Sequence, residues 1–195
     1  MAGSSTQQLS GAPSLFRHTI DRLNSVWHQR ALTIFMVIVL AHWLEHLFQA
    51  FQIWALGWPR HHALGALGLV APWLVHSEWL HYGYALAMLI GLALLRPGFV
   101  GTARVWWNIA LAIQIWHHFE HALLLLQVQL GRPFFGAAAP TSILQLLVPR
   151  VELHLFYNAV VFAPMVIAMI YHRYPPASDD ERARCTCAHV RAALG

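Results

Sequence analysis

The stretch Ala31–Leu56 reads ALTIFMVIVLAHWLEHLFQAFQIWAL and decides the fold class. It is long and apolar enough for a membrane-spanning helix, which needs about 20 such residues. Its one acidic residue, Glu45, forms the pattern His-x-x-Glu-His with His42 and His46. An ionisable side chain inside a bilayer is costly unless it is paired, protonated or bound to a cation. The stretch therefore predicts a membrane span with a functional site inside it.

Three further apolar stretches follow, at Trp73–Leu95, Val105–Leu130 and Ser142–Tyr171. Only 10% of the residues are charged and 58% are hydrophobic, whereas soluble domains carry roughly 25% charged residues. We therefore predict an all-α integral membrane protein, built as a four-transmembrane-helix bundle with up-down-up-down order. The predicted transmembrane domain covers residues 30–174.

The segments outside this domain differ from it in composition. Residues 1–13 are small and polar, and we expect a flexible N-terminus there. Residues 14–29 place apolar side chains at helical spacing opposite Arg17 and Asp21, which predicts an amphipathic helix lying on the membrane surface. The polar residues 175–195 are predicted to form a cytoplasmic tail.

The chain has no lysine, so its twelve basic residues are all arginine. Nine of them flank the span ends that lie on one side of a four-span protein: Arg17, Arg22, Arg30, Arg96, Arg104, Arg173, Arg182, Arg184 and Arg191. The other three are Arg60, Arg132 and Arg150. This asymmetry predicts that both termini lie in the cytoplasm, and we expect a bacterial-type inner membrane. The arginines form no basic stripe, so nucleic acid is not an expected partner.

The first and third spans share a pattern of polar residues. His42, Glu45, His46 and Gln52 match His117, Glu120, His121 and Gln127 at a constant offset of 75 residues. Glu78 in the second span and Glu152 in the fourth are 74 residues apart. These matches predict a duplicated two-helix hairpin, with repeats at about 30–96 and 104–172. The two copies would run in the same direction around a pseudo-two-fold axis along the membrane normal.

Each of the four spans carries a carboxylate close to a histidine. The groups are His42-x-x-Glu45-His46, Glu78-x-x-His81, His117-His118-x-Glu120-His121 and Glu152-x-His154. Counted from the predicted span ends, the carboxylates fall within roughly one helical turn of a common depth, and residues three or four apart share a helix face. We therefore predict a dinuclear metal centre with the ligands Glu45, His46, Glu78, His81, Glu120, His121 and Glu152, and with His42, His117 and His154 beside them.

The order of these groups resembles the ferritin-like carboxylate-bridged di-iron proteins. The resemblance implies that Glu45 and Glu120 are the ligands from the single-Glu helices. It also implies that Glu78 and His81 form a paired set and that Glu152 is the fourth carboxylate. The chain departs from that family at the last histidine, where it has leucine. The additional histidines resemble the histidine-rich sites of integral-membrane hydroxylases and desaturases.

Two ions held by carboxylates and imidazoles suit iron, with zinc and copper as alternatives. Such a centre predicts a metal-dependent membrane oxidoreductase or oxygenase, whose hydrophobic small-molecule substrate arrives from the lipid bilayer. An electron-donor protein or a larger membrane complex is an expected partner.

Three alternatives stay open. A b-type haem cytochrome or quinone-reactive electron-transfer subunit would use histidines such as His46 and His121 as axial ligands. A transporter would pass divalent metal ions or protons between the same groups. In the structural alternative, the Glu and His side chains only hydrogen-bond to one another across helices.

The two cysteines, Cys185 and Cys187, lie in the tail as Cys-Thr-Cys-Ala-His189. A structural disulfide is not expected in the reducing cytoplasm. The motif can bind copper or zinc, and an interpretation without any function is equally open.

Overall fold

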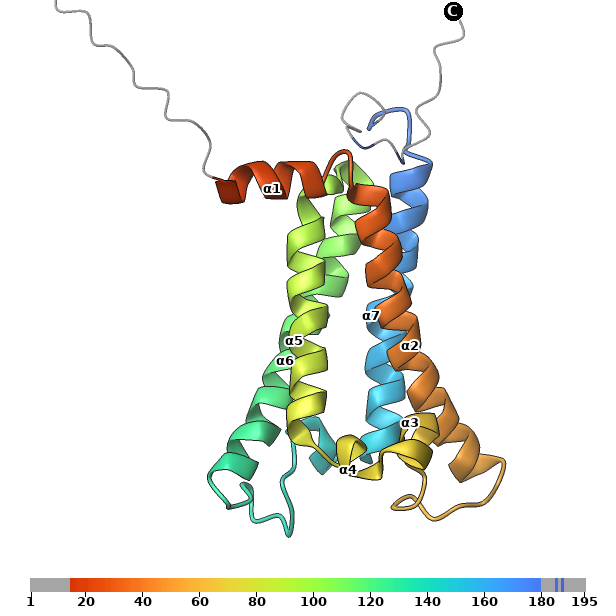
Figure 1. The fold of residues 1–195 in the computed structure, drawn as a ribbon, viewed down its shortest axis with the longest axis vertical. Helices are drawn as coiled ribbons and strands as arrows, with labels where there is room; N and C mark the ends of the chain where they lie inside the picture. The colour runs from red at the N-terminus through yellow and green to blue at the C-terminus, as the bar shows by residue number, and fades with distance from the viewer. Residues whose placement is uncertain (1–14, 180–184, 186, 188–195) are drawn as a thin grey trace, which may run out of the picture.

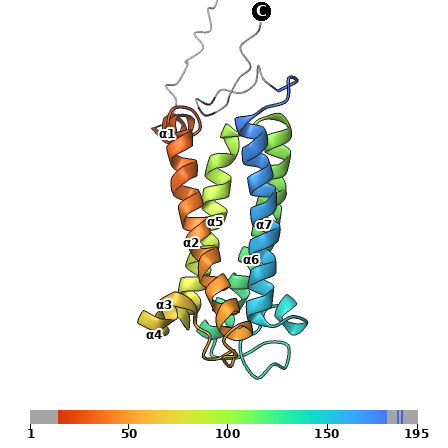
Figure 2. The same cartoon turned by 90° about the vertical axis from the view of Figure 1, so that its right-hand side faces the viewer.

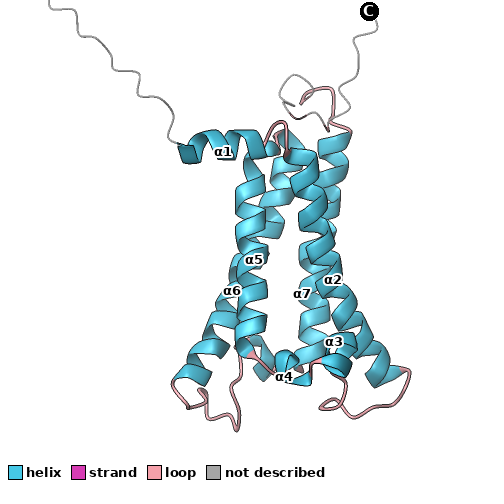
Figure 3. Cartoon of the chain, viewed as in Figure 1, coloured by secondary structure: helices cyan, strands magenta, loops and turns pink. Residues whose placement is uncertain are grey.

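The computed structural model describes residues 15–179, together with Cys185 and Cys187. This described part contains helices and loops and no strand (Figure 3). The segment predicted to be flexible at 1–13 and most of the tail predicted at 175–195 lie outside the described residues. Four helices are long and apolar enough to cross a membrane, which confirms the prediction of four apolar helices of spanning length.

The helices follow the predicted spans with different starting points. In chain order they are α1 (Leu15–Leu23), α2 (His28–Trp54), α3 (Gly65–Val70), α4 (Pro72–Val75), α5 (Glu78–Leu95), η1 (Arg96–Gly98), α6 (Gly101–Gln129), η2 (Leu144–Leu146) and α7 (Arg150–Arg173). The second predicted span is divided, because Pro72 begins the separate helix α4 and Ser77 has an extended backbone. The fourth begins only after Pro149, whose backbone is also extended.

These later starts change the depth of two carboxylates. Glu78 is the first residue of α5, and Glu152 is the third residue of α7. The predicted span starts place both side chains deeper than the structure does. The residues counted as the beginnings of these spans belong to α4, to η2 and to the loops around them.

The four long helices lie side by side and form the body of the molecule (Figures 1 and 2). α6 packs against α5 and α7, and α2 packs against α7 and α5. Figure 1 shows α1, the start of α2 and the end of α7 at one end of the molecule, and α3 and α4 at the other. We call these the α1 end and the α3 end.

The segment predicted as one amphipathic helix at 14–29 is α1 followed by a turn. α1 lies crosswise to α2 (Figure 1), and its residues Leu15 and Phe16 are 84% and 70% exposed, as a helix on a membrane surface requires. Asn24 holds the turn to the bundle. Its Nδ2 donates a hydrogen bond to the Leu94 carbonyl (2.9 Å), and its Oδ1 accepts one from the Gly98 amide (2.8 Å).

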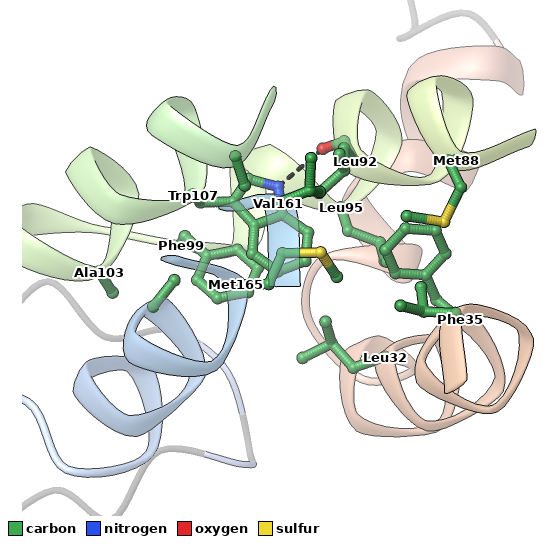
Figure 4. Close-up of a cluster of buried hydrophobic side chains, with 13 residues drawn as sticks. Leu32, Phe35, Met88, Leu92, Leu95, Phe99, Ala103, Trp107, Val161 and Met165 are labelled. Carbon is green, nitrogen blue, oxygen red and sulfur yellow. Dashed lines mark hydrogen bonds between the residues drawn. The ribbon is translucent and has the colours of Figure 1, made fainter. Parts of the chain in front are cut away.

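Apolar side chains from all four long helices fill the half of the bundle nearer α1 (Figure 4). Leu92, Phe99, Trp107 and Met165 are completely buried there. The Trp107 ring stacks on Phe99 at 4.0 Å between centroids, and its Nε1 donates a hydrogen bond to the Leu92 carbonyl (2.8 Å). This packing separates the α1 end from the polar residues in the half nearer α3.

Candidate metal centre

Six histidines from the four long helices meet in the half of the bundle nearer α3. They are His42 and His46 of α2, His81 of α5, His117 and His121 of α6, and His154 of α7, and we call them the histidine cluster. His46 and His154 have ring centroids 4.8 Å apart, and His154 and His121 have centroids 5.2 Å apart. His81 adds α5 to the cluster, since its ring centroid lies 6.1 Å from that of His121 in α6. All six are among the predicted metal-binding residues.

Helical spacing explains why the histidines face one another. His42 and His46 are four residues apart, as are His117 and His121, so each pair lies on one face of its helix. The centroids within the two pairs are 4.6 and 4.8 Å apart. Tyrosines support these faces: Tyr84 stacks on His42 at 4.0 Å. Two imidazoles from each of α2 and α6 therefore meet single imidazoles from α5 and α7.

Four histidines bind an acceptor oxygen through Nδ1. The pairs are His46 with Gln49 Oε1 (2.8 Å), His81 with the Ser77 carbonyl (2.9 Å), His117 with Gln114 Oε1 (3.4 Å) and His154 with the Arg150 carbonyl (2.7 Å). An acceptor next to Nδ1 places the proton on that nitrogen and leaves Nε2 with a free lone pair. Metal-binding histidines use the same arrangement, because it fixes both the tautomer and the orientation of the ring.

Three histidines already have the spacing of a metal site. His117, His121 and His154 offer ligand atoms that all lie within 4.8 Å of one another, and each residue is at most 6% exposed. The Nε2 atoms of His117 and His121 are 3.0 Å apart. The Nε2 atoms of His46 and His154 are buried and have no hydrogen-bond partner among the described residues. A bound cation would satisfy these lone pairs, which otherwise carry the cost of burial without a partner.

The two carboxylates of α2 and α6 that were predicted as metal ligands form hydrogen bonds with other parts of the protein. Glu45 accepts hydrogen bonds from the Ala66 amide (3.2 Å) and the Leu67 amide (2.9 Å) at the start of α3. Glu120 accepts hydrogen bonds from the Leu144 amide of η2 (2.8 Å) and from the Tyr157 hydroxyl (2.7 Å). The first amides of a helix have no partner within it, and these two glutamates supply one.

The other two carboxylates are paired with arginines. Both Glu78 oxygens accept from the Arg150 guanidinium, at 2.5 and 2.8 Å. Glu152 accepts from Arg60 at 2.6 Å. The structure therefore brings together the six predicted histidines, and it places Glu45, Glu78, Glu120 and Glu152 with partners of their own.

Two glutamines bind loop backbone in a similar way in the two halves of the sequence. Gln52 accepts from the Gly65 amide (2.8 Å) and donates to the Gly65 carbonyl (3.2 Å). Gln127 accepts from the Phe134 amide (2.8 Å) and the Thr141 amide (3.2 Å), and it donates to the Thr141 carbonyl (2.9 Å). Each glutamine thus fixes the loop that follows its own helix.

Three cavities border the histidine cluster. An internal one of about 20 Å³ touches His42, His81, His117 and His121, which is enough space for a water molecule. A polar one of about 340 Å³ touches His46, His81, His154 and two arginines, Arg60 and Arg150. A third, of about 290 Å³, has mainly apolar walls contributed by α2, α3, α4 and α5, including Leu67 and Leu80, and reaches His42 and His46. The cluster is therefore bordered by one polar and one mainly apolar cavity.

No protein-family model, curated protein or solved structure matches the chain.

Proposed function

We propose that the chain is an integral-membrane metalloprotein in which the histidine cluster holds a dinuclear metal centre, and that it acts as an oxidoreductase on a lipophilic substrate. One observation carries the proposal. Four of the six histidines have Nδ1 bound to an oxygen, and the buried Nε2 atoms of His46 and His154 have no partner among the described residues. In this arrangement the imidazoles are oriented as ligands.

The proposed ligands are imidazoles alone. His117, His121 and His154 would hold one ion, and His42, His46 and His81 the second. Imidazole binds iron, copper and zinc, and the resemblance to histidine-rich membrane hydroxylases favours iron. A redox-active ion with an open coordination position supplies oxygen activation when bound. The protein side chains orient the ligands, since Tyr84 and Tyr157 stack on the imidazoles of His42 and His117 at 4.0 and 4.3 Å.

The cavities support an enzyme that takes its substrate from the bilayer. The mainly apolar cavity between α2 and α5 suits a hydrophobic chain, and the polar cavity beside Arg150 suits water or a proton donor. A transporter would need a polar route through both halves of the bundle. The apolar packing around Leu92, Phe99 and Trp107 argues against such a route.

A haem is less compatible with the packing of the rings. A bis-histidine haem needs its flat macrocycle between the two axial imidazoles. The ring of His154 contacts both His46 and His121, at 4.8 and 5.2 Å, so an imidazole already lies between the two predicted axial ligands. We therefore prefer non-haem metal ions.

We also propose a topology for the four long helices. We infer a duplicated hairpin in an up-down-up-down bundle, and the matching contacts of Gln52 with Gly65 and of Gln127 with Thr141 support the duplication. The arginine asymmetry supports cytoplasmic termini in a bacterial-type inner membrane, with an electron-donor protein as partner.

Oxygen uptake by the iron-loaded protein tests the oxidoreductase class. The full chain in detergent is loaded with Fe(II) without oxygen, freed from unbound iron and then mixed with oxygenated buffer. We expect oxygen uptake by the wild type and by His18→Ala, whose histidine is exposed on α1. We expect none above background in the triple variant His117→Ala/His121→Ala/His154→Ala. A protein that binds iron but takes up no oxygen would reject the redox chemistry and leave the metal centre in place.

A further inference from the structure

A second group of metal-binding side chains lies at the α1 end. It consists of His28 at the start of α2, His172 in the last turn of α7, and Cys185 and Cys187 of the tail, and we call it the tail cluster. One ligand atom from each residue lies within 4.8 Å of the other three. His28 and His46 lie on the same helix, about 27 Å apart at 1.5 Å per residue, so the tail cluster is separate from the histidine cluster.

The most informative member of the tail cluster is His28. Its side chain is completely buried, and neither ring nitrogen has a hydrogen-bond partner among the described residues. Gly98 packs directly on the ring, since a Cβ at this position would meet the imidazole Cε1 at 2.3 Å. The fold thus makes room for a buried imidazole whose nitrogens make no hydrogen bond of normal geometry with the described residues. Such a group needs an explanation, and an absent ion is one.

The other members complete a set of two nitrogen and two sulfur donors. His172 Nε2 lies 2.8 Å from the Cys187 sulfur, and the imidazoles of His28 and His172 have centroids 5.0 Å apart. Phe99 contacts both rings, at 5.4 and 4.7 Å, and forms an apolar wall. His172, Cys185 and Cys187 are 5%, 6% and 9% exposed. Two imidazoles and two thiolates in a closed site are a ligand set of structural zinc.

The two sulfurs are joined by a disulfide in the structure, so an ion requires the reduced pair. We propose that His28, His172 and the reduced Cys185 and Cys187 bind one zinc ion. A dithiol reductant transfers two electrons and two protons to the disulfide and gives two thiols. Zinc then binds the sulfurs as thiolates and releases the two protons. The disulfide form and the zinc form exclude each other.

The zinc ion would fasten the tail to the bundle. It would join the start of α2 to the end of α7, so that the first and last spans are held together through the tail. A neighbouring contact already holds this segment: Asp179 Oδ2 accepts a hydrogen bond from the Thr102 amide at the start of α6 (2.9 Å). The proposal does not rest on the histidine cluster, because the two sites share no residue.

Cobalt(II) tests the tail cluster selectively, because Cys185 and Cys187 are the only cysteines of the sequence and only a thiolate gives cobalt an intense charge-transfer band. The full chain in detergent is stripped of metal with a chelator, reduced with a dithiol, separated from reagents without oxygen and titrated with cobalt. We expect an intense sulfur-to-cobalt charge-transfer band that saturates at one cobalt per chain and disappears when zinc is added. The disulfide form and Cys185→Ser/Cys187→Ser should give no band.

The imidazoles are tested by His28→Ala and His172→Gln, with His18→Ala as the control. Each of the first two should weaken cobalt binding at least tenfold, whereas the control should bind as the wild type does. Circular dichroism checks that helix content is unchanged. The proposal is overturned if the reduced wild type shows no sulfur band, or if both imidazole variants keep wild-type affinity, since the tail alone would then bind the ion. An intact band without metal in the histidine cluster would reject only the proposed function.

Discussion

The two halves of the bundle are held together by different means. Near α1, the helices contact one another through apolar side chains such as Trp107 and Met165. Near α3, buried apolar side chains such as Leu124 and Leu153 are joined by polar contacts between segments, which include the pair of Glu78 with Arg150 and the bonds of Gln127 to its loop. Lipid supplies little hydrophobic force between helices, and polar groups in a membrane must find partners within the protein.

The two halves also differ in which of their polar side chains are available to bind a ligand. In the α3 half, the carboxylates of Glu45 and Glu120 bind backbone amides, so they stabilise short helices. Four imidazoles bind the protein through Nδ1, and the buried Nε2 atoms of His46 and His154 have no partner among the described residues. The carboxylates are therefore occupied by hydrogen bonds that stabilise the fold, whereas imidazole nitrogens remain available to bind an ion. Both kinds of residue lie close together in the sequence.

The largest expected effect is loss of metal from the α3 half. His154→Ala removes an imidazole of the predicted triad, and metal affinity should fall at least about 100-fold, beyond the 10–100-fold that loss of a supporting residue costs. Dialysis against a metal buffer followed by elemental analysis measures this. His18→Ala should bind as the wild type does. Equal affinity in His154→Ala would show that this histidine is a packing residue.

A substitution in the α1 half should affect stability and leave the metal in place. Trp107→Ala opens a cavity among Leu92, Phe99 and Met165 and should lower the free energy of unfolding by about 3–5 kcal/mol. Trp107→Phe loses one hydrogen bond and part of the buried ring, at a cost of about 1–3 kcal/mol. Thermal unfolding in detergent gives both values. Metal loss from the folded Trp107→Phe protein would contradict the separation of the two halves.

The smallest expected effects concern the loops of the α3 half. Gln52→Ala and Gln127→Ala each remove hydrogen bonds to loop backbone and should lower stability by about 1–3 kcal/mol. Similar losses would support duplicated hairpins, whereas a loss in only one variant would argue against equivalent roles. Gln129→Ala, at an exposed position on the same helix as Gln127, is the control and should be neutral in thermal unfolding.

Much of the fold could be predicted from the sequence, because apolar runs of spanning length have few alternatives. The residues at which the helices begin could not be predicted from the sequence. Pro149 stands inside the predicted fourth span, and the predicted second span is interrupted at Ser77. Hydropathy alone does not show that α7 begins after Pro149 and α5 at Glu78. This is why counting along the predicted spans places Glu78 and Glu152 too deep.

The histidines of the site could be predicted for the same kind of reason, since spacing of four residues fixes a common helix face. The hydrogen-bond partners of the carboxylates could not be predicted, because these partners come from segments distant in the sequence. Arg60 reaches Glu152 across 92 residues, and Leu144 reaches Glu120 across 24. The roles of Gln49 and Gln114 beside His46 and His117 were missed, although their i±3 spacing from each histidine was visible in the sequence.

The central claim is that the histidine cluster holds metal ions. The most direct measurement is the metal content of the full chain purified in detergent from cells, together with its optical spectrum. We predict about two irons per chain without a Soret band, and at most one iron in the variant His117→Ala/His121→Ala/His154→Ala, which keeps His42, His46 and His81. A Soret band, or a wild type that binds no metal at this cluster, would contradict the account.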